Sequence, residues 1–585
     1  MGPSLYDALA SSRPYYGLSE HLFSVDIYGV DALDSDAFIR KLIDDFSTGN
    51  SPEMSGIPNI ESNSLIRARD EVIPKYLDRL CDRILGSGPT VVGFTTTFNQ
   101  TMSSLALARR IKKRAPDVRT ILGGASVHGV MGSALHGMCS SYVDHVFLGE
   151  AEIAFGEYIQ RLKNGIGMDG IPGMSYADGP VPDNRIVTAM DEVPMPDYSD
   201  YLSEIGRVKS ELGLHIDVNC LPFEMSRGCW WGMRKQCKFC GNEPDSITFR
   251  AKSVKRAVSE IIRLSAINGI NRLAATDWIL RSSDVEEFLR ELTSYDLDIF
   301  LFFEVRPSGM KKYQLKMMRD AGIVRVQPGI ESFSTPFLRL LNKDMTGLGQ
   351  IQFLRWCREI GIDVGYNLLY RMPGEKEEWY SSMIETISKI HHLQPPTNPA
   401  CIIELMRYSP MFDRREECGI DSFSPREDYN GIFPLADGPR LEDIGYFFAY
   451  ESKKLADPSI YAEFVSSVWN WIDDYNLKRP RYEYSIGPGF TRIIDTRKPD
   501  ARVITLRGMH QDVLLLCDSI QTMPKLIKHL TPVYGEKSVA NELGGVIAEL
   551  VDIDVLIRDG ERLLSLPIGC KYRATEELIR YVKSG

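Results

Sequence analysis

The chain has 585 residues, of which 43% are hydrophobic, so it is long enough for about three or four domains with buried cores. Its net charge is −11, and no Lys/Arg-rich block offsets this charge, which argues against a nucleic-acid partner. No apolar run approaches the ~18 residues that span a bilayer, and the first residues lack the features of a secretion signal. We therefore expect a soluble, cytoplasmic protein that binds neither nucleic acid nor membrane.

Residues 90–164 alternate predicted strands and helices. Three strands are predicted there, at 90–95, 118–122 and 143–148. Gly123-Gly124 follows the second strand, and Gly149-Glu150 follows the third. Because parallel strands joined by crossover helices bind ligands at their carboxyl ends, this pattern predicts a nucleotide- or cofactor-binding half-domain. Gly-Gly after a strand is also ordinary turn chemistry, so this signal alone leaves both possibilities open.

Residues 166–218 are rich in Gly, Pro and Asp and are predicted to be a linker. The strand and helix alternation resumes over 219–430. Strands are predicted to end at Arg227, Asp277, Arg306, Glu331, Tyr370 and Arg407. Six such units predict a partial parallel (β/α)6 barrel whose site lies at the carboxyl ends of the strands. The expected fold class is α/β.

The C-terminal part is predicted as an aromatic-rich extension, 431–500, and a domain over 501–585. Three predicted helices precede a hairpin that turns at Asp559-Gly560, which is typical of a winged-helix domain in an α+β region. The third helix, around 539–550, contains almost no Arg or Lys, which argues against DNA binding. A peptide leader that adds a strand to the hairpin edge fits better, and a purely structural cap is the alternative.

Most of the eleven cysteines stand alone in apolar surroundings and are predicted to be small buried hydrophobes. Cys229, Cys237 and Cys240 instead group as C-x7-C-x2-C directly after the first barrel strand. Structural zinc requires a closed set of four ligands, which Cys220 or His215 could complete. A four-iron cluster bound at three irons, with the fourth open to a ligand, fits the spacing and the position better.

The segment SRGCWWGMRKQCKFCGN, followed by FRAKS, QPGIES, WCREIGI and NLLYRMPGE, resembles the radical S-adenosylmethionine (SAM) superfamily. More narrowly, the chain is similar to the cobalamin-dependent radical SAM C-methyltransferases that mature ribosomally synthesised peptides (RiPPs), in a subfamily marked by the C-x7-C-x2-C variant. The resemblance extends over nearly the whole chain, with its specific motifs between residues 90 and about 410.

This resemblance implies three cofactors: a [4Fe-4S] cluster, SAM and cobalamin. It implies reductive cleavage of SAM to a radical that activates an sp3 carbon, which then takes a methyl group from methylcobalamin. The implied partners are a precursor peptide and an external electron donor such as flavodoxin or ferredoxin. Two alternatives stay open: a cobalamin-dependent rearrangement or cyclisation without methylation, and a non-catalytic peptide-binding protein with a structural metal.

The resemblance also assigns roles to residues. The three grouped cysteines would hold the cluster. The SAM contacts map onto Phe239, Glu243, Glu304, Gln327, Glu331 and Asn367. The cobalamin contacts map onto Thr95, Phe98, Asn99, Gln100, Gly123, Gly124, Gly149 and Glu150. Asp277-Trp278, where the family has Asp-Asn, is expected to face the substrate. Each polar residue near SAM has a structural alternative inside the barrel mouth.

Two departures from the family qualify the cobalamin assignment. No Asp-x-His-x-x-Gly motif is present, so cobalamin would bind without a histidine ligand from this chain. The family begins with another strand and helix before the stretch similar to LYDALASSRP, so we expect the N-terminal domain, residues 1–165, to lack its first strand and helix. Such a sheet would expose apolar surface, and a half-domain that binds nothing is the alternative.

Overall fold

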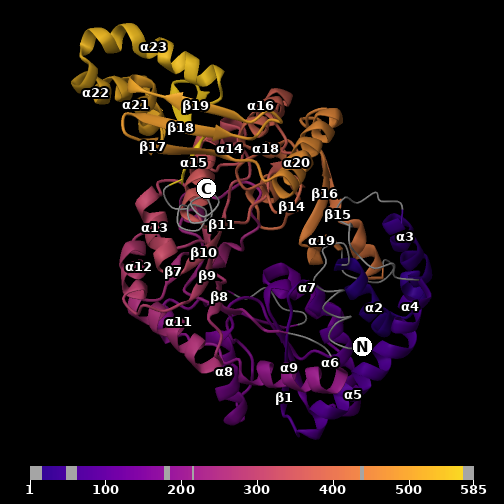
Figure 1. The fold of residues 1–585 in the computed structure, drawn as a ribbon. Helices are drawn as coiled ribbons and strands as arrows, with labels where there is room; N and C mark the ends of the chain where they lie inside the picture. Colours follow the sequence, from indigo (N-terminus) through magenta and orange to yellow (C-terminus); the bar gives the residue numbers. More distant parts are fainter. Residues whose placement is uncertain are drawn as a thin grey trace.

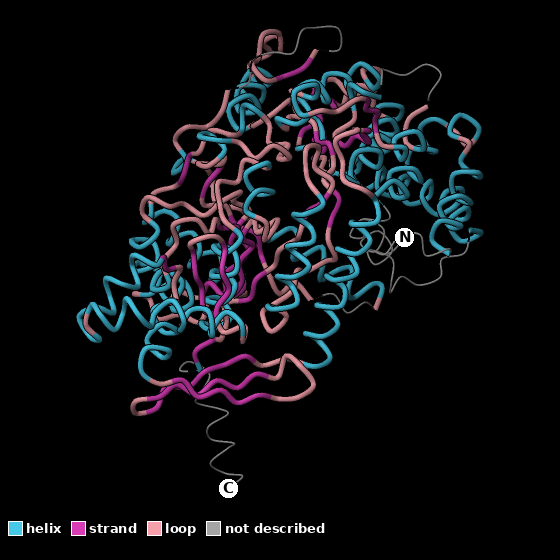
Figure 2. Tube along the Cα trace, turned by 90° about the horizontal axis from the view of Figure 1, so that it is seen from above, coloured by secondary structure: helices cyan, strands magenta, loops and turns pink. Residues whose placement is uncertain are grey.

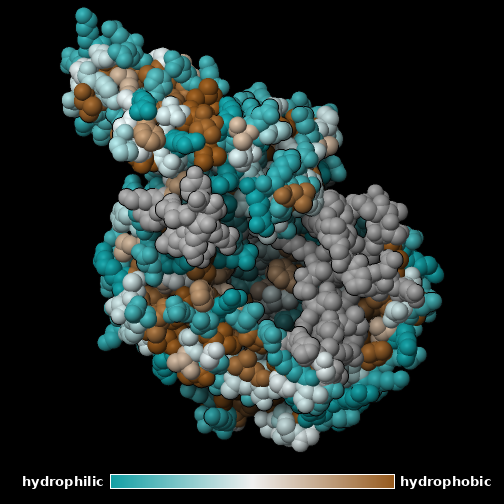
Figure 3. All heavy atoms as spheres, in the orientation of Figure 1, coloured by the Kyte–Doolittle hydropathy of each residue, from teal (hydrophilic) through white to brown (hydrophobic). Residues whose placement is uncertain are grey.

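The computed structural model describes residues 16–47, 62–176, 183, 185–213, 217–434 and 441–570. Figure 1 shows the N-terminal elements and the barrel side by side, with the C-terminal part (yellow) projecting from the rest. Figure 3, in the same orientation, shows a recess between the N-terminal elements and the barrel. The stretch LYDALASSRP and His215 lie outside the described residues. Among the described residues, no helix is long and apolar enough to cross a bilayer.

The described chain begins with helices that the sequence analysis did not predict. They are α2 (Tyr16–Tyr28), α3 (Ser35–Ser47), α4 (Ser62–Arg67) and α5 (Ile73–Gly86). Helix α2 packs on α6 (Thr101–Arg114) and buries Leu18, Leu22 and Phe23. Apolar residues lie on all sides of α2, so its sequence shows little helical periodicity.

The N-terminal sheet has the order β1-β2-β3-β4. Its strands are β1 (Val91–Thr95), β2 (Arg119–Gly123), β3 (His145–Phe147) and β4 (Met174–Ser175). The first three are parallel and lie where the sequence predicts strands, whereas β4 is antiparallel and falls within the predicted linker. Helices α6, α7 (Gly129–Cys139) and α8 (Glu152–Lys163) connect them. Within the described ranges, β1 has no strand on its outer side.

A five-stranded parallel sheet of order β11-β10-β9-β8-β5 forms the centre of the barrel. Its strands are β5 (Leu221–Phe223), β8 (Arg272–Ala275), β9 (Phe300–Val305), β10 (Ile323–Pro328) and β11 (Asp363–Val364). A parallel pair, β12 (Leu369–Tyr370) and β13 (Cys401–Ile402), continues it through a bridge between Glu331 and Leu368. Figure 2 shows these strands surrounded by helices.

The barrel helices are amphipathic, and α11 (Val254–Asn268) begins and ends at residues that its sequence favours. They are α11 (Val254–Asn268), α12 (Val285–Thr293), α13 (Lys312–Asp320), α14 (Thr335–Leu340), α15 (Gly347–Ile360) and α16 (Glu377–Ile390). Ser253 caps α11 by accepting from Arg256 N, and Gly269 ends it in the left-handed conformation. Helix α12 buries Phe288 and Leu289, each of which stabilises the fold by roughly 1.5–3 kcal/mol.

The aromatic-rich extension adds a small antiparallel sheet and a long helix beside the barrel. The sheet has the order β14-β16-β15, formed by Leu405–Met406, Phe447–Glu451 and Ser422–Pro425 respectively. Helix α20 (Pro458–Lys478) packs on α16 and buries Phe464, Val468 and Trp471. Its N-cap is Asp457, which accepts from Ser459 N.

The C-terminal helices and hairpin lie where the sequence predicts them. Helices α21 (Gly508–Leu516), α22 (Met523–Tyr534) and α23 (Glu536–Asp552) precede β21 (Leu556–Asp559) and β22 (Arg562–Ser565). A second sheet of order β19-β18-β17-β23 lies beside them. Its strands are Arg502–Leu506, Phe490–Asp495, Tyr482–Gly487 and Ile568–Gly569.

Candidate functional site

The three grouped cysteines lie on one loop whose base is a short antiparallel ribbon. Strand β6 (Ser226–Arg227) pairs with β7 (Arg250–Ala251), so the loop leaves and returns at the same place. Gly228 has a φ of +80°, and a Cβ atom there would lie 2.3 Å from the carbonyl oxygen of Thr248. Only glycine fits this close approach, and it turns the chain directly into Cys229.

The loop carries a short helix, α10 (Gly232–Lys235), between its first two cysteines. The backbone N–H of Gly232 donates to Cys229 Sγ at 3.2 Å. Trp231 lies under the guanidinium of Arg306, which is 3.5 Å from the ring centroid. The loop is therefore anchored to the carboxyl end of β9, which ends at Val305.

The electrostatics of the three thiols indicate that they lie near one another. Burial, and then the charges of Cys237 and Cys229, raise the pKa of Cys240 to about 12. Burial also raises the pKa of Cys237, while Lys343 and Arg306 oppose that rise. The three cysteines are half-buried, cysteines bind metals as thiolates, and a nearby positive charge favours the thiolate. The loop therefore fits an iron-sulfur cluster.

The structure separates Cys220 from this group. Cys220 precedes the amino end of β5, whereas the three cysteines follow the opposite end of that strand. Cys220 is exposed and lines a cavity with Arg272, the first residue of β8. Among the residues that the structure describes, no three His, Cys, Asp or Glu side chains form a site for a single metal ion.

A cavity of about 690 Å³ lies along the inner face of the barrel strands. Three of the predicted SAM contacts line it: Gln327, Glu331 and Asn367. Gln327 is paired with Glu304 across β10 and β9, which places a fourth predicted residue on the same sheet. Asn367 Oδ1 accepts from Asn398 Nδ2 at 3.4 Å. The structure thus brings these residues together from three successive strand ends.

Two acidic residues at the barrel mouth, Glu331 and Glu304, lie near the buried ammonium group of Lys343. Lys343 Nζ lies 2.9 Å from Glu331 Oε1 and 5.8 Å from the centroid of the Phe239 ring. Burial, and then the charge of Glu331, raises the pKa of Glu304 to about 7, while Lys343 lowers it. Glu331 has a φ of 59°, a conformation that costs on the order of 1–3 kcal/mol for a residue with a side chain and is concentrated at functional sites.

A second cavity, of about 130 Å³, connects the N-terminal domain to the cysteine loop. Phe98, a predicted cobalamin contact, and Glu243, a predicted SAM contact, both line it. Gly241, two residues before Glu243, has no room for a side chain, because a Cβ atom would lie 2.6 Å from the carbonyl oxygen of Arg407. Residues predicted for two different cofactors therefore face one space.

The other predicted cobalamin contacts have mixed environments. Thr95 is exposed at the end of β1, Asn99 is buried, and Gln100 accepts from Thr97 N at 3.0 Å as part of a capping box. Gly123 O accepts from the N–H of Thr96 at 2.7 Å. Gly124 has a φ of +105°, and a Cβ atom there would lie 2.3 Å from Thr96 O. This glycine is needed for contact between two loops of the protein, so ligand approach does not explain it.

Glu150, predicted as a cobalamin contact, is engaged by the barrel domain. Its carboxylate accepts from Arg250 Nη2 at 2.6 Å, from Arg227 Nη1 at 3.1 Å and from Val187 N at 3.0 Å. Its side chain is 11% exposed. The preceding Gly149 is half-buried. These contacts give Glu150 a structural role, and its contact with cobalamin stays a prediction.

Asp277, expected to face the substrate, holds the base of the cysteine loop. Its carboxylate accepts from Met225 N at 2.8 Å and from Ser226 Oγ at 2.6 Å, and the residue is 1% exposed. Burial raises its pKa to about 6. Trp278 is half-buried beside it. Direct contact of either residue with a substrate stays a prediction. The hydrogen bonds of Asp277 hold the base of the cysteine loop in position.

Three residues of the site were not predicted from the sequence. Lys343 and Arg306 supply the positive charge beside the cysteines, and Glu20 lines the second cavity. Glu20 accepts from Met102 N at 2.8 Å and Thr101 N at 3.1 Å, at the beginning of α6. Arg306 ends a predicted strand, which was an available signal. Lys343 and Glu20 carry no sequence pattern of their own.

Comparison with known proteins identifies the barrel region. Residues 223–387 match the family model described as Radical SAM superfamily. The chain is 25% identical over 346 residues to an uncharacterized methyltransferase of Pyrococcus horikoshii, covering 56% of this chain and 72% of that protein. It is 25% identical over 323 residues to the cytidylyl-2-hydroxyethylphosphonate methyltransferase of Streptomyces wedmorensis, covering 49% of this chain and 58% of that protein.

Two similar solved structures share the fold. The cobalamin-dependent SAM radical enzyme OxsB with aqua-cobalamin bound matches with a TM-score of 0.52 and 17% identity, over 69% of this chain and 61% of that one. The radical SAM methyltransferase TsrM from Kitasatospora setae, with cobalamin and a [4Fe-4S] cluster bound, matches with a TM-score of 0.52 and 17% identity, over 71% of this chain and 85% of that one. This chain therefore spans about three fifths of the length of OxsB.

The chain thus contains a radical SAM domain with a mixed α/β fold. Such a domain uses a [4Fe-4S] cluster and SAM, so both cofactors are implied for this chain.

Proposed function

We propose that this protein is a cobalamin-dependent radical SAM enzyme that methylates an unactivated carbon of a ribosomally synthesised peptide. The observation that carries the proposal is the shared cavity in which Phe98 of the N-terminal domain faces Glu243 of the cysteine loop. A methyl group carried on the N-terminal side could reach a substrate carbon activated on the barrel side only if both sites open into one space. The methyltransferase names of two relatives support the reaction class.

The chain's own residues would bind and orient the cofactors. Cys229, Cys237 and Cys240 would hold the cluster, which supplies the electron for reductive cleavage of SAM. Lys343 and Arg306 would balance the negative charge of the thiolates and of the SAM carboxylate. Glu331 lines the barrel cavity and Glu304 pairs with Gln327 of that cavity, so both could accept hydrogen bonds from SAM there. Glu243 lines the second cavity. The burial of these groups would exclude water from the reacting centre.

The N-terminal domain would bind cobalamin at the carboxyl ends of β1, β2 and β3. The loops after β1 and β2, with Thr97, Phe98 and Ser126, form part of the wall of the second cavity. Phe98 is 48% exposed and stacks on Phe447 at 6.2 Å, so an aromatic surface is available for a flat macrocycle. Both OxsB and TsrM, which share this fold, have cobalamin bound in their structures.

A peptide substrate would be held by the C-terminal domain. Strand β21 is at the edge of the sheet formed by β20 (Gln521–Thr522), β22 and β21 in that order, and within the described residues its outer side has no strand partner. A leader peptide could add a strand there. Helix α23 contains a single basic residue, Lys537, which is a poor surface for nucleic acid. Hydrogen exchange of the full chain with its precursor peptide tests this: protection of β21 supports it, and protection confined to β19 contradicts it.

Product analysis tests the reaction itself. The enzyme is reconstituted without oxygen with iron, sulfide and cobalamin, reduced, and incubated with SAM and the precursor peptide. Methylated peptide together with S-adenosylhomocysteine and 5′-deoxyadenosine is expected. A peptide that is cyclised or rearranged without added mass from a methyl group would contradict the methyl transfer but keep the radical chemistry. Cys237→Ala should lose all three products, and sustained cleavage of SAM by that variant would contradict the cluster assignment.

A further inference from the structure

We propose that Glu150 is a positioning residue that ties the N-terminal domain to the base of the cysteine loop and fixes the path of that loop. The inference rests on the proposed function, because the loop is the cluster-binding segment there. The proposed role of Glu150 is to position the cysteine loop, and this role depends on the docking of the N-terminal domain on the barrel.

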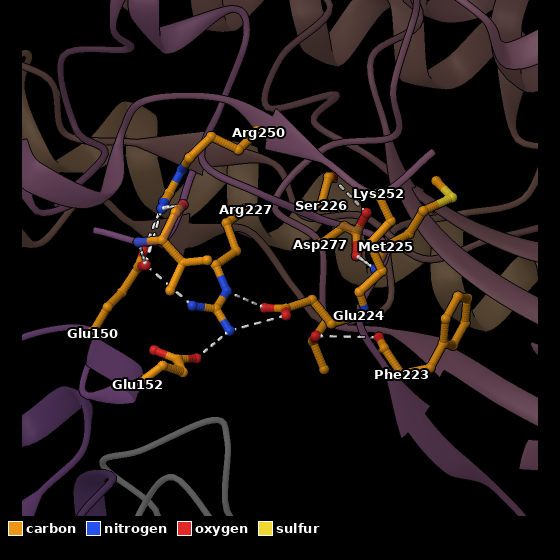
Figure 4. A network of polar contacts seen from close by, with 12 residues as sticks. Glu150, Glu152, Phe223, Glu224, Met225, Ser226, Arg227, Arg250, Lys252 and Asp277 are labelled. Atoms are coloured by element: carbon orange, nitrogen blue, oxygen red, sulfur yellow. Dashed lines mark hydrogen bonds and ion pairs between the residues drawn. The ribbon is translucent and has the colours of Figure 1, made fainter. Parts of the chain in front are cut away.

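Glu150 reaches both strands of the β6–β7 ribbon at the same level. Arg227 and Arg250 are partners in the register of that ribbon, and both guanidinium groups point to the Glu150 carboxylate (Figure 4). Arg250 binds it with two nitrogen atoms, Nη2 to Oε1 at 2.6 Å and Nη1 to Oε2 at 2.9 Å. Arg227 Nη1 donates to Oε2 at 3.1 Å. One carboxylate thus connects two cations that would otherwise repel each other across the ribbon.

The contact is shielded from water, which increases its effect on geometry. The side chains of Arg250, Glu150 and Arg227 are 7%, 11% and 18% exposed. Arg250 also donates to the carbonyl oxygens of Val187 and Thr248, at 2.7 and 3.0 Å, so its position is fixed on several sides. Removing the Glu150 charge would leave the largely buried guanidinium of Arg250 without its carboxylate partner, which is strongly unfavourable, whereas Arg227 would keep Glu152 and Glu224.

A short covalent path leads from this contact to the first cysteine. Arg227 is followed by Gly228, whose backbone has no space for a side chain, and then by Cys229. Cys229 N donates to Ile247 O at 3.0 Å, which holds the outgoing and the returning parts of the loop together. A shift of Arg227 would therefore move the start of the cysteine loop directly.

Other contacts at the ribbon come from the barrel. Asp277 binds Met225 N and Ser226 Oγ, and Lys252 forms a buried ion pair with Glu260 at 2.9 Å. Arg281 Nη1 donates to Lys252 O at 2.6 Å. These contacts lie within one domain, whereas Glu150 comes from the end of β3 in the other domain. Glu150 thus links the N-terminal domain to both arginines of the ribbon, so the docking of that domain acts on the loop through it.

Glu152 supplies a matched control on the same segment. Its carboxylate accepts from Arg227 Nη2 at 2.6 Å, but it does not bind Arg250, and it is 36% exposed. Arg227 also keeps two bonds to Glu224, at 2.7 and 3.1 Å, when Glu152 is changed. Glu152→Gln therefore removes one charge at the domain boundary without releasing the ribbon.

The first test uses the protein without added metal. Hydrogen exchange of peptides that cover residues 225–251 is compared between wild type, Glu150→Gln, Glu150→Asp and Glu152→Gln. Glu150→Gln should raise the exchange rate of this segment on the order of tenfold or more, Glu150→Asp by less, and Glu152→Gln little. Equal exchange in wild type and Glu150→Gln would overturn the inference. A rise spread evenly over the whole chain would overturn it as well.

The second test uses the cluster as a local probe. After anaerobic reconstitution and reduction, the electron paramagnetic resonance signal of Glu150→Gln should differ from that of wild type, and Glu150→Asp should partly restore it. An identical signal in Glu150→Gln and wild type would overturn the inference while leaving the cluster in place. A wild-type protein that takes up no iron would contradict the proposed function, and the exchange experiment would still decide the role of Glu150.

Discussion

Lys343 and Glu331 form an ion pair, with 2.9 Å between Nζ and Oε1, where the barrel cavity meets the cysteine loop. The ammonium group also opposes the rise of the pKa of Cys237 and of Glu304. One buried cation is therefore near two carboxylates and a cysteine thiol. Because SAM carries a carboxylate of its own, this cation is a natural partner for it in the proposed complex.

We predict that Lys343→Met weakens SAM binding at least about tenfold in the reconstituted enzyme, because a charge-assisted contact of about 1.5–3 kcal/mol is lost. The variant also leaves Glu331 without its partner, so the free energy of unfolding should fall by about 3–5 kcal/mol. Calorimetric titration with SAM and denaturant unfolding measure these effects. Lys255→Met, at an exposed position on α11, is the control and should change neither.

A second prediction concerns Gly124, at the end of β2. Gly124→Ala should destabilise the N-terminal domain by about 1–2 kcal/mol or more, because φ is +105° and the new Cβ would lie 2.3 Å from Thr96 O. Gly137→Ala, in helix α7 with no atom within 4 Å of the new Cβ, should be neutral or stabilising by up to about 1 kcal/mol. Thermal unfolding of the two variants compares them. Equal stability of the two variants would contradict the prediction, because the loop after β2 would then have moved to make room for the new Cβ.

A third prediction follows from Glu20. Burial raises its pKa from 4.5 to about 8, so the folded protein keeps the proton over a range in which the unfolded chain loses it. The folded state therefore becomes less stable as the pH rises from about 4.5 to 8, by about 1.4 kcal/mol per unit of pKa difference. Glu20→Gln should reduce this decline, while Asp277 and Glu304, whose pKa values burial also raises, keep part of it.

The measurement is the free energy of unfolding at pH 5 and pH 8 in denaturant, for wild type, Glu20→Gln and Glu463→Gln. Glu463 is exposed on α20 and should leave the pH dependence unchanged. A wild-type protein that is more stable at pH 8 than at pH 5, with no flattening in Glu20→Gln, would contradict the assigned proton.

The sequence predicted the parts of the fold that repeat a local pattern. The strands before Gly123-Gly124 and before Gly149, and the hairpin at Asp559-Gly560, combine apolar periodicity with turn residues, and all are present. Helix α2 was missed because it is apolar on all sides. Strand β4 was taken for linker because its two residues lie among Gly, Pro and Asp.

In the candidate site, too, the residues that could be predicted from the sequence are those with a local sequence pattern. The cysteines were found because their spacing is a local signal. Glu150 was predicted to contact a cofactor. Its partners Arg227 and Arg250 are 77 and 100 residues away in the sequence, and no pattern near Glu150 predicts these contacts. Lys343 became part of the site only because the turn after α14 packs against the cysteine loop, where Lys238 N donates to Leu341 O at 3.1 Å.

The most direct test of the account is iron and sulfide analysis of protein purified and reconstituted without oxygen. Wild type and Cys220→Ala should each contain about four iron and four sulfide atoms per chain, because Cys220 lies at the other end of β5. The triple variant Cys229→Ala, Cys237→Ala, Cys240→Ala should contain almost none. Zinc in place of iron in the wild type, or a full cluster in the triple variant, would contradict it.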